Sequence, residues 1–388
     1  MKDKILILAA DLEQVLPIAK SLYDKGFEIH GIFSSKLSYG YGSRYIKRKY
    51  IHQNAVEIED YYLFIKSVLQ KERYVSINPM RDSAAEVMCK YRDDLLQYTA
   101  YVMPDADGFE RGFDKQRLME VCKMHGYPHP ETYIVRNGSL CGLDIEEIRY
   151  PVLIKPNHTF GARGMTLCRN KDELEKKYPI IFNQFGECHL QTYIPEGGHQ
   201  VEVQIYINEK QELVQSSVIK KFRWYPNKGG SSCCNISCKN EKIVDICYKV
   251  LKSIGWVGFA DFDTIEDPRT GELLIMEINP RVPACVKSAF ASGIDWADVI
   301  VGEYLKKSHK VYQMNREVYL RFLGVEVLWF LKSENKWHTK PNWFNFFGKD
   351  IFYQDMSDWT DPMPFIRGTI GNIKKQLSPE FRKSKAGV

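Results

Sequence analysis

The stretch GFADFDTIEDPRTGELLIMEINPR, residues 258–281, constrains the fold more than any other part of this chain. Pro268 and Gly271 are turn-forming residues between two runs of β-forming residues, so the stretch predicts a β-hairpin. The second strand begins with apolar residues and then carries Glu277 and Asn279 on one face, because side chains alternate along a strand. A carboxylate and an amide at the end of a strand do not suit a hydrophobic core, and they suit a functional site.

The two strands of this hairpin bring oxygen ligands together. Counting outward from the turn places Asp261 opposite Glu277, with Asn279 one step along on the same face. Facing carboxylates repel one another unless a cation lies between them, and oxygen ligands without His or Cys suit Mg²⁺. The pattern predicts a metal site that holds a triphosphate, with Arg281 beside it. The structural alternative is a carboxylate pair neutralised by Arg281 or a nearby lysine.

Composition excludes several classes of protein. A chain of 388 residues is long enough for two or three domains, and its net charge of +5 suits anionic small molecules without indicating a nucleic-acid binder. No apolar run approaches the roughly 20 residues of a membrane span, and the N-terminus does not read as a signal peptide, so we expect a cytoplasmic protein. The ten cysteines lack paired spacing and should be reduced thiols.

Residues 4–33 read as a β-α-β unit, which is typical of a doubly wound nucleotide-binding domain. The first turn, AADLEQ, lacks the GxGxxG motif that cradles a dinucleotide, so a dehydrogenase is not expected. Further strand and helix patterns continue to about residue 110, where we place the end of this domain.

Two lysines stand where an anion could bind. Asp114 is a predicted N-cap of a helix over residues 115–125, which places Lys115 in the first helical turn. Lys155 closes an apolar strand and is followed by a loop with Gly161, Arg163 and Gly164, whose backbone N–H groups could cradle phosphate. A solvated Lys115 and a purely structural hairpin are the alternatives.

Residues 188–207 predict two strands, the second with valine and isoleucine inward and with Glu202 and Gln204 outward. Residues 218–233 predict a strand that breaks into a basic, glycine-rich loop. Its cations Lys220, Lys221 and Arg223 suggest a loop that closes over an acidic carboxylate substrate, and a solvated loop is the alternative.

With these residues in view, the chain resembles the ATP-grasp ligases over roughly residues 1–305. The segments that carry the resemblance are DFDTIEDPRTGELLIMEINPR, IKPNHTFGARGM, QTYIPEGG and IKKFRWYPNKGG, the last of which is similar to a loop in D-aspartate-ligase-like proteins. The glycine loop has only two glycines, which argues against a biotin carboxylase.

The resemblance implies an α/β and α+β fold: a doubly wound, Rossmann-like pre-ATP-grasp domain (1–110) followed by a two-lobed ATP-grasp fold with antiparallel sheets (111–305). The ATP lobe would span about 111–195 and the metal and substrate lobe about 196–305. Residues 306–388 would form an aromatic-rich C-terminal extension.

The resemblance also implies roles for individual residues. Lys115 and Lys155 would contact the ATP phosphates, and the loop with Gly161, Arg163 and Gly164 would cover them. Gln191, Tyr193 and Ile194 would form the adenine hinge, and Glu196 or Glu202 would contact the ribose. Asp261, Glu277 and Asn279 would bind one or two Mg²⁺ ions, or Mn²⁺. Arg281 and Lys155 would have catalytic roles.

These roles predict an ATP-dependent, ADP-forming carboxylate–amine ligase that forms an acylphosphate and then an amide, with an amino acid as one substrate. The alternatives are phosphorylation of bicarbonate or a carboxylate as in carbamoyl-phosphate synthase, and a nucleotide-binding regulatory protein without turnover. The expected partners are ATP, a carboxylate and an amine acceptor, with no nucleic acid. A homodimer, and a contact of the basic C-terminus with a membrane surface, are left open.

Overall fold

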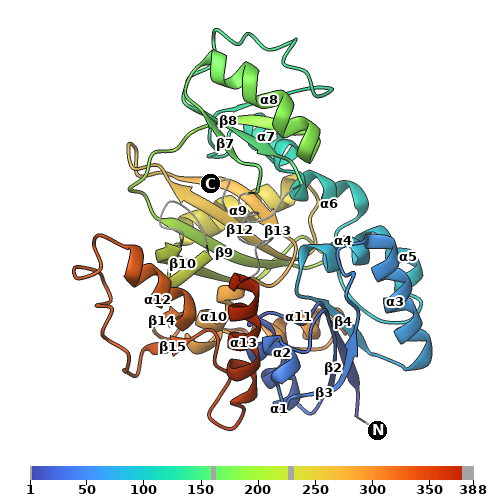
Figure 1. Ribbon diagram of the computed structural model, residues 1–388. Coiled ribbons are helices and arrows are strands. Elements are labelled where there is room, and N and C mark those ends of the chain that lie inside the picture. Colours follow the sequence, from blue (N-terminus) through green and yellow to red (C-terminus); the bar gives the residue numbers. More distant parts are fainter. Residues whose placement is uncertain (1, 159–162, 226–230, 378–388) are drawn as a thin grey trace.

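The computed structural model describes residues 2–158, 163–225 and 231–377. These residues form three β-sheets, of four, seven and four strands, with helices packed against each (Figure 1). Within the described ranges, no helix has the length and apolar character that crossing a membrane requires.

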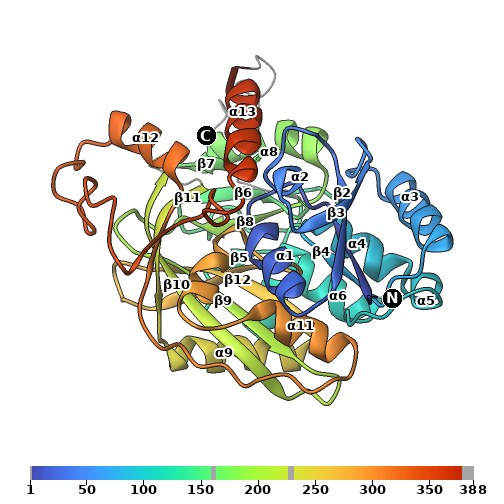
Figure 2. The ribbon, with the colours of Figure 1, turned by 90° about the horizontal axis from the view of Figure 1, so that it is seen from below.

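The N-terminal sheet has the strand order β3-β2-β1-β4, and all its strands are parallel. Its strands are β1 (Lys4–Leu8), β2 (Glu28–Phe33), β3 (Ile46–Ile51) and β4 (Ser76–Pro79). Its helices are α1 (Val15–Asp24), α2 (Tyr39–Gly42), α3 (Ile58–Lys71), α4 (Asp82–Lys90) and α5 (Arg92–Leu95). Helices α1 and α2 lie on one side of the sheet and α3 on the other, so the apolar run of β1 is buried on both faces (Figures 1 and 2).

Two consecutive helices, α6 (Ala106–Phe113) and α7 (Lys115–His125), lead to the small antiparallel sheet. The predicted caps of α7 are confirmed: Asp114 Oδ1 accepts a hydrogen bond from the backbone N–H of Arg117, and Gly126 has φ of +69°. The small sheet has the order β5-β8-β6-β7 and carries helix α8 (Lys171–Phe185). Its strands are β5 (Thr132–Tyr133), β6 (Val152–Pro156), β7 (Thr166–Cys168) and β8 (Cys188–Thr192).

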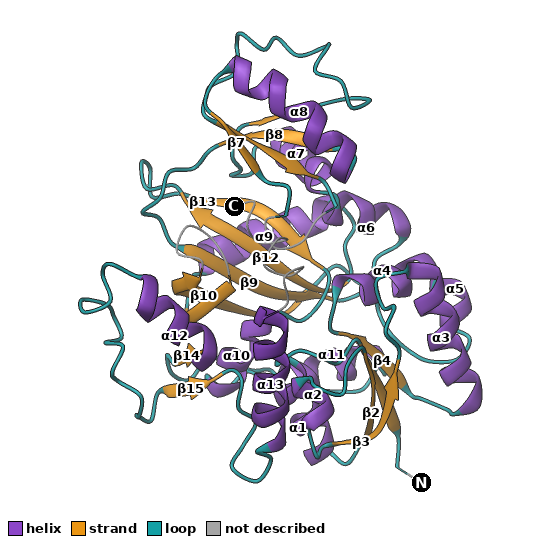
Figure 3. Ribbon diagram, in the orientation of Figure 1, coloured by secondary structure: helices purple, strands orange, loops and turns teal. Residues whose placement is uncertain are grey.

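The seven-stranded sheet is the centre of the molecule, with the order β13-β12-β9-β10-β11-β14-β15 (Figure 3). Its strands are β9 (Gln200–Ile207), β10 (Leu213–Tyr225), β11 (Ser231–Cys238), β12 (Gly258–Glu266), β13 (Leu273–Asn279), β14 (Tyr319–Arg321) and β15 (Ile351–Tyr353). All neighbours pair antiparallel except β14 and β15. Two strands of the aromatic-rich C-terminal segment therefore extend the central sheet.

Helices cover both faces of this sheet. They are α9 (Glu241–Ser253), the 3₁₀ helix η1 (Ala284–Val286), α10 (Lys287–Ala291), α11 (Trp296–Tyr304) and α12 (Leu323–Lys332). The predicted outward position of Glu202 and Gln204 is wrong, because η1 and α11 bury that face. Cys285 in η1 contacts both side chains, and Trp296 in α11 donates to Ser217 of β10 at 3.0 Å.

The last helix, α13 (Met363–Leu377), returns to the N-terminal domain and packs against α2. Gly368 and Gly371 permit the close approach. A Cβ would lie 2.2 Å from the Tyr39 ring at Gly368, and 2.0 Å from the carbonyl oxygen of Leu37 at Gly371. The C-terminal segment thus contacts both the central sheet and the N-terminal sheet's helices.

Candidate functional site

The β12–β13 hairpin is present, but its register differs from the prediction. Asp261 lies opposite Asn279, and Asp263 lies opposite Glu277, because a bulge between Asp263 and Thr264 shifts the pairing. The predicted pairing of Asp261 with Glu277 is therefore wrong. Asp263 lies on the same polar face. The sequence could have predicted this position, because Asp261 and Asp263 are two residues apart on one strand and side chains alternate between its faces.

Acidic side chains from β9 and β12 contact one lysine. Lys221 Nζ lies 2.5 Å from Glu202 Oε1 and 3.0 Å from Asp263 Oδ1. Asp261 is 1% exposed, and its Oδ1 has no hydrogen-bond partner among the described residues. Burial, together with Glu202 and Asp263, raises the pKa of Asp261 well above its usual value. Burial opposes ionisation of Asp263 too, but Lys221 holds its pKa below the usual value.

Arg281 connects this cluster to the N-terminal domain. Its Nε lies 3.1 Å from Asp82 Oδ1 at the start of α4, and its Nη2 donates to Asn279 Oδ1 at 3.1 Å. Its Nη1 is 3.8 Å from Asp261 Oδ2. Burial opposes the charge of Arg281, but Asp82 and Asp261 raise its pKa, so the guanidinium is held charged and oriented.

The two predicted phosphate-contacting lysines approach the cluster from the small sheet and from α7. Lys115 Nζ lies 3.3 Å from Glu277 Oε2. Lys155, at the end of β6, is buried and donates to Gln191 Oε1 at 2.8 Å. Burial lowers the pKa of Lys155 to about 8, although nearby Glu277 opposes the change. Helix α7 and strand β6 therefore each bring a lysine near Glu277.

The glycine-loop and hinge predictions are only partly visible. Gly161 lies outside the described residues, and Arg163 is exposed. Gly164 has φ of +75°, and a Cβ there would lie 2.8 Å from the ring of Phe185, so glycine is required. Between β8 and β9, Ile194 is buried and Glu196 is exposed. The backbone N–H of Tyr193 donates to Pro151 O at 3.0 Å.

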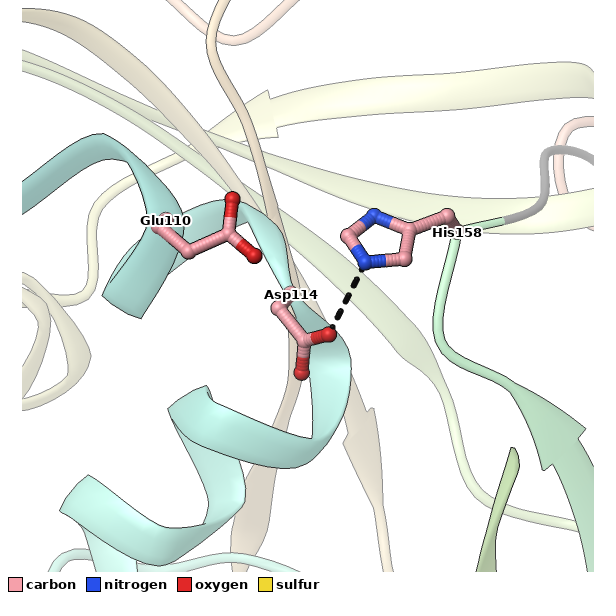
Figure 4. A group of neighbouring side chains, drawn as sticks. All are labelled: Glu110, Asp114 and His158. Carbon is pink, nitrogen blue, oxygen red and sulfur yellow. Dashed lines mark ion pairs between the residues drawn. The ribbon is translucent and has the colours of Figure 1, made fainter. Parts of the chain in front are cut away.

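A second group of possible ligands lies at the base of the glycine loop (Figure 4). His158 Nε2 is 3.0 Å from Asp114 Oδ2, and the ligand atoms of Glu110, Asp114 and His158 all lie within 4.8 Å of one another. Asp114 raises the pKa of His158, although burial opposes this. The ion pair between His158 and Asp114 holds the start of the glycine loop against the turn between α6 and α7.

The predicted substrate loop needs correction. Lys220, Lys221 and Arg223 lie within strand β10, which continues to Tyr225. Lys221 faces the acidic cluster and Lys220 the opposite face of the sheet. Arg223 belongs to neither, because its guanidinium is buried against Glu326 of α12, with Nε 2.8 Å from Oε1. Glu326 is 103 residues away along the chain, so no local pattern predicts this ion pair.

The donor set fits a divalent cation. Four carboxylates, from Glu202, Asp261, Asp263 and Glu277, lie near four cations, those of Lys115, Lys155, Lys221 and Arg281. Among the described residues, Asp261 Oδ1 has no hydrogen-bond partner. Asn279 adds an amide whose Nδ2 lies 3.4 Å from Asp261 Oδ2. Glu202 and Asp261 are buried, whereas Asp263 and Glu277 are half-buried. Hard oxygen ligands without His are the arrangement that Mg²⁺ prefers. Asp261 remains a predicted ligand, with Asp263 as an addition that the sequence analysis missed.

Sequence comparison finds related proteins. Residues 114–305 match the family model for the carbamoyl-phosphate synthase L chain, ATP binding domain. The chain is 26% identical over 243 residues to a D-aspartate ligase of Enterococcus faecium (strain Aus0004), covering 56% of this chain and 58% of the relative. It is 26% identical over 237 residues to the 2-oxoglutarate carboxylase small subunit of Hydrogenobacter thermophilus, covering 52% and 46%. The chain thus spans about half the length of these curated relatives.

Solved structures share the fold at low identity. The biotin carboxylase domain of 2-oxoglutarate carboxylase from Hydrogenobacter thermophilus superposes with a TM-score of 0.67 at 20% identity, covering 82% of this chain and 74% of that one. L-amino acid ligase from Bacillus licheniformis superposes with a TM-score of 0.62 at 13% identity, covering 82% and 79%. Residues 114–305 are thus similar to the carbamoyl-phosphate synthase L chain, ATP binding domain, and the fold of the chain is similar to that of these carboxylase and ligase structures.

Proposed function

We propose that this protein is an ATP-dependent carboxylate–amine ligase that takes an amino acid as one substrate. The observation that carries the proposal is the convergence of Lys115, Lys155 and Arg281, from three segments, on the carboxylates of the β12–β13 hairpin. The names of two similar proteins, a D-aspartate ligase and an L-amino acid ligase, support this reaction class. The proposed division of the chain is 1–110, 111–305 and 306–388.

In the proposed complex, Lys115 and Lys155 contact the ATP phosphates, with Arg163 and Gly164 beside them and Gly161 in the same loop. Gln191, Tyr193 and Ile194 contact the adenine, and Glu196 is the remaining candidate for the ribose. Glu202 is withdrawn from that role, because Lys221 and Cys285 already engage its buried carboxylate.

Asp261, Asp263, Glu277 and Asn279 would hold Mg²⁺, which supplies positive charge that offsets the charge of the triphosphate. A substrate carboxylate oxygen attacks the γ-phosphorus and ADP leaves, giving an acylphosphate. The amine then attacks the acyl carbon, the C–O bond to phosphate breaks, and the nitrogen loses a proton. Arg281 suits stabilisation of the transferring phosphoryl group, because Asp82 fixes its orientation and the surrounding acids keep it charged.

The test is ADP formation from ATP and Mg²⁺ with pools of amino acids and amines. One pool should elicit turnover in the wild type, and Glu277→Gln should reduce it by about a hundredfold or more, as removal of a charge-stabilising group does elsewhere. Glu272→Gln is the matched control, because this exposed glutamate lies in the same hairpin's turn. Turnover that survives Glu277→Gln, or a protein that binds no ATP, would contradict the proposal.

A further inference from the structure

Three segments far apart in sequence meet where strands β1 and β4 end. We call this place the junction, and it consists of residues 11–14, 78–82 and 354–355. Gln14 Nε2 donates to Met80 O at 2.9 Å, and Gln354 Nε2 donates to Glu13 Oε1 at 2.7 Å. Parallel α/β sheets bind ligands at the carboxyl ends of their strands, which is where the junction lies.

The junction adjoins the proposed reaction site on two sides. Asp82, at one end of the junction, is the residue that holds Arg281 at 3.1 Å. Lys287, six residues after Arg281, donates to Tyr353 O at 2.7 Å and to Ser357 O at 3.3 Å, and also to Met356 O. These bonds clamp Gln354 and Asp355 of the C-terminal segment against α10.

Buried polar atoms of the junction lack partners. Asp355 is 1% exposed and Gln14 is 2% exposed, yet Asp355 Oδ1 and Gln14 Oε1 have no hydrogen-bond partner among the described residues. Both atoms are acceptors. A buried polar atom left unpaired is destabilising, and folded proteins contain few of them. Two unpaired acceptors, beside the second buried carboxylate of Glu13, therefore point to a missing hydrogen-bond donor.

The two buried carboxylates of the junction would face this donor, beside cations that already lie near them. Glu13 and Asp355 are both buried, and burial raises the pKa of each, that of Asp355 to about 6 with Glu13 contributing. Arg81 and Lys375 face Glu13, and Lys287 faces Asp355, but burial lowers the pKa of Lys287 to about 8. The Tyr39 hydroxyl and the backbone of Leu323 also lie near these carboxylates, and burial, with Glu13 and Asp355, raises the pKa of Tyr39.

We infer that the junction is the subsite for the amine-bearing substrate, in which Glu13 and Asp355 receive its primary ammonium group. The inference rests on the proposed ligase function and deepens it. The C-terminal segment would then help to select the amine substrate, because Asp355, which follows strand β15, is one of the two carboxylates of this subsite.

The test compares Asp355→Asn and Glu13→Gln with Asp350→Asn. Both junction variants keep side-chain size, and Asp350 is a partly exposed residue just before β15 that pairs with Arg316. The probes are ammonium chloride and the common L-amino acids with their D enantiomers, each titrated at saturating MgATP. ADP release should show a KM for the amine probe at least tenfold higher in both junction variants, with an unchanged Kd for MgATP, whereas Asp350→Asn should match the wild type.

The outcomes separate the two proposals. If the wild type turns over and its amine KM is unchanged in both junction variants that still bind MgATP, the inference is overturned. If the wild type forms no ADP with any probe, the failure belongs to the proposed ligase function. The thermal shift that the same probes produce then decides the inference: a shift in the wild type that Asp355→Asn abolishes supports it, and no shift overturns it.

Discussion

Glu326 should be one of the residues on which the stability of this protein most depends. It is fully buried and accepts four hydrogen bonds from two guanidinium groups. Arg223 donates at 2.8 and 3.1 Å, and Arg321 donates at 3.1 and 2.5 Å. Glu326→Gln would remove the carboxylate shared by two buried cations. Breaking a buried ion pair by removing one partner costs about 3–5 kcal/mol.

The structure favours the lower end of that range. Each arginine keeps a carbonyl acceptor after the substitution, because Arg223 also donates to Pro341 O at 2.6 Å and Arg321 to Asn345 O at 2.6 Å. We therefore expect Glu326→Gln to lower the free energy of unfolding by about 3 kcal/mol. The control is Asp245→Asn, which breaks the exposed pair with Lys249 and should leave stability nearly unchanged, because water screens exposed ion pairs.

Urea unfolding followed by tryptophan fluorescence measures this difference, since Trp329 and Trp343 lie beside the cluster. A triple variant that replaces all three charged residues with apolar ones of similar size should recover much of the loss, because well-packed apolar groups can substitute for a buried ion pair. A midpoint for Glu326→Gln that equals that of Asp245→Asn would refute the reasoning, since the two carboxylates would then contribute alike.

Two further predictions concern nucleotide binding and acid stability. Lys155→Met should weaken ATP binding by about thirtyfold, because a charge-assisted hydrogen bond contributes roughly 2 kcal/mol. Titration with a fluorescent ATP analogue measures this affinity. The control is Lys171→Met, at an exposed lysine paired with Glu146, which should leave the affinity unchanged. Burial opposes ionisation of Glu72, but Lys4 and Arg48 lower its pKa to about 2. Its stabilising contribution is therefore complete above about pH 4.5, the pKa of an unfolded glutamate, and is lost as the pH falls toward 2. Melting temperatures over that range should fall more steeply in the wild type than in Glu72→Gln, while exposed Glu57→Gln should follow the wild type.

Local patterns in the sequence predicted the elements that depend on local chemistry. The caps of α7, the strand that ends at Lys155 and the β12–β13 hairpin all follow from nearby residues. The register of the hairpin could not be obtained by counting, because a bulge is an insertion in the pairing that periodicity does not reveal.

The errors arose where a partner is remote in sequence. Arg223 reads as a solvated cation until Glu326 is placed beside it, and Glu202 reads as outward until η1 covers that face. The junction shows the same limit, since Glu13 and Gln354 are 341 positions apart. No local pattern predicts that the end of the chain completes a surface begun by its first strand.

The pairing of β14 with β11 has a consequence for how the protein is made. The ribosome delivers β9 to β13 long before it delivers β14 and β15, so a nascent chain that ends near residue 305 presents β11 as an unpaired edge. Unpaired strand edges are templates for association between chains. During translation, the growing polypeptide must therefore keep this edge from other copies until β14 has been synthesised, and products truncated before β14 should be recovered as aggregates.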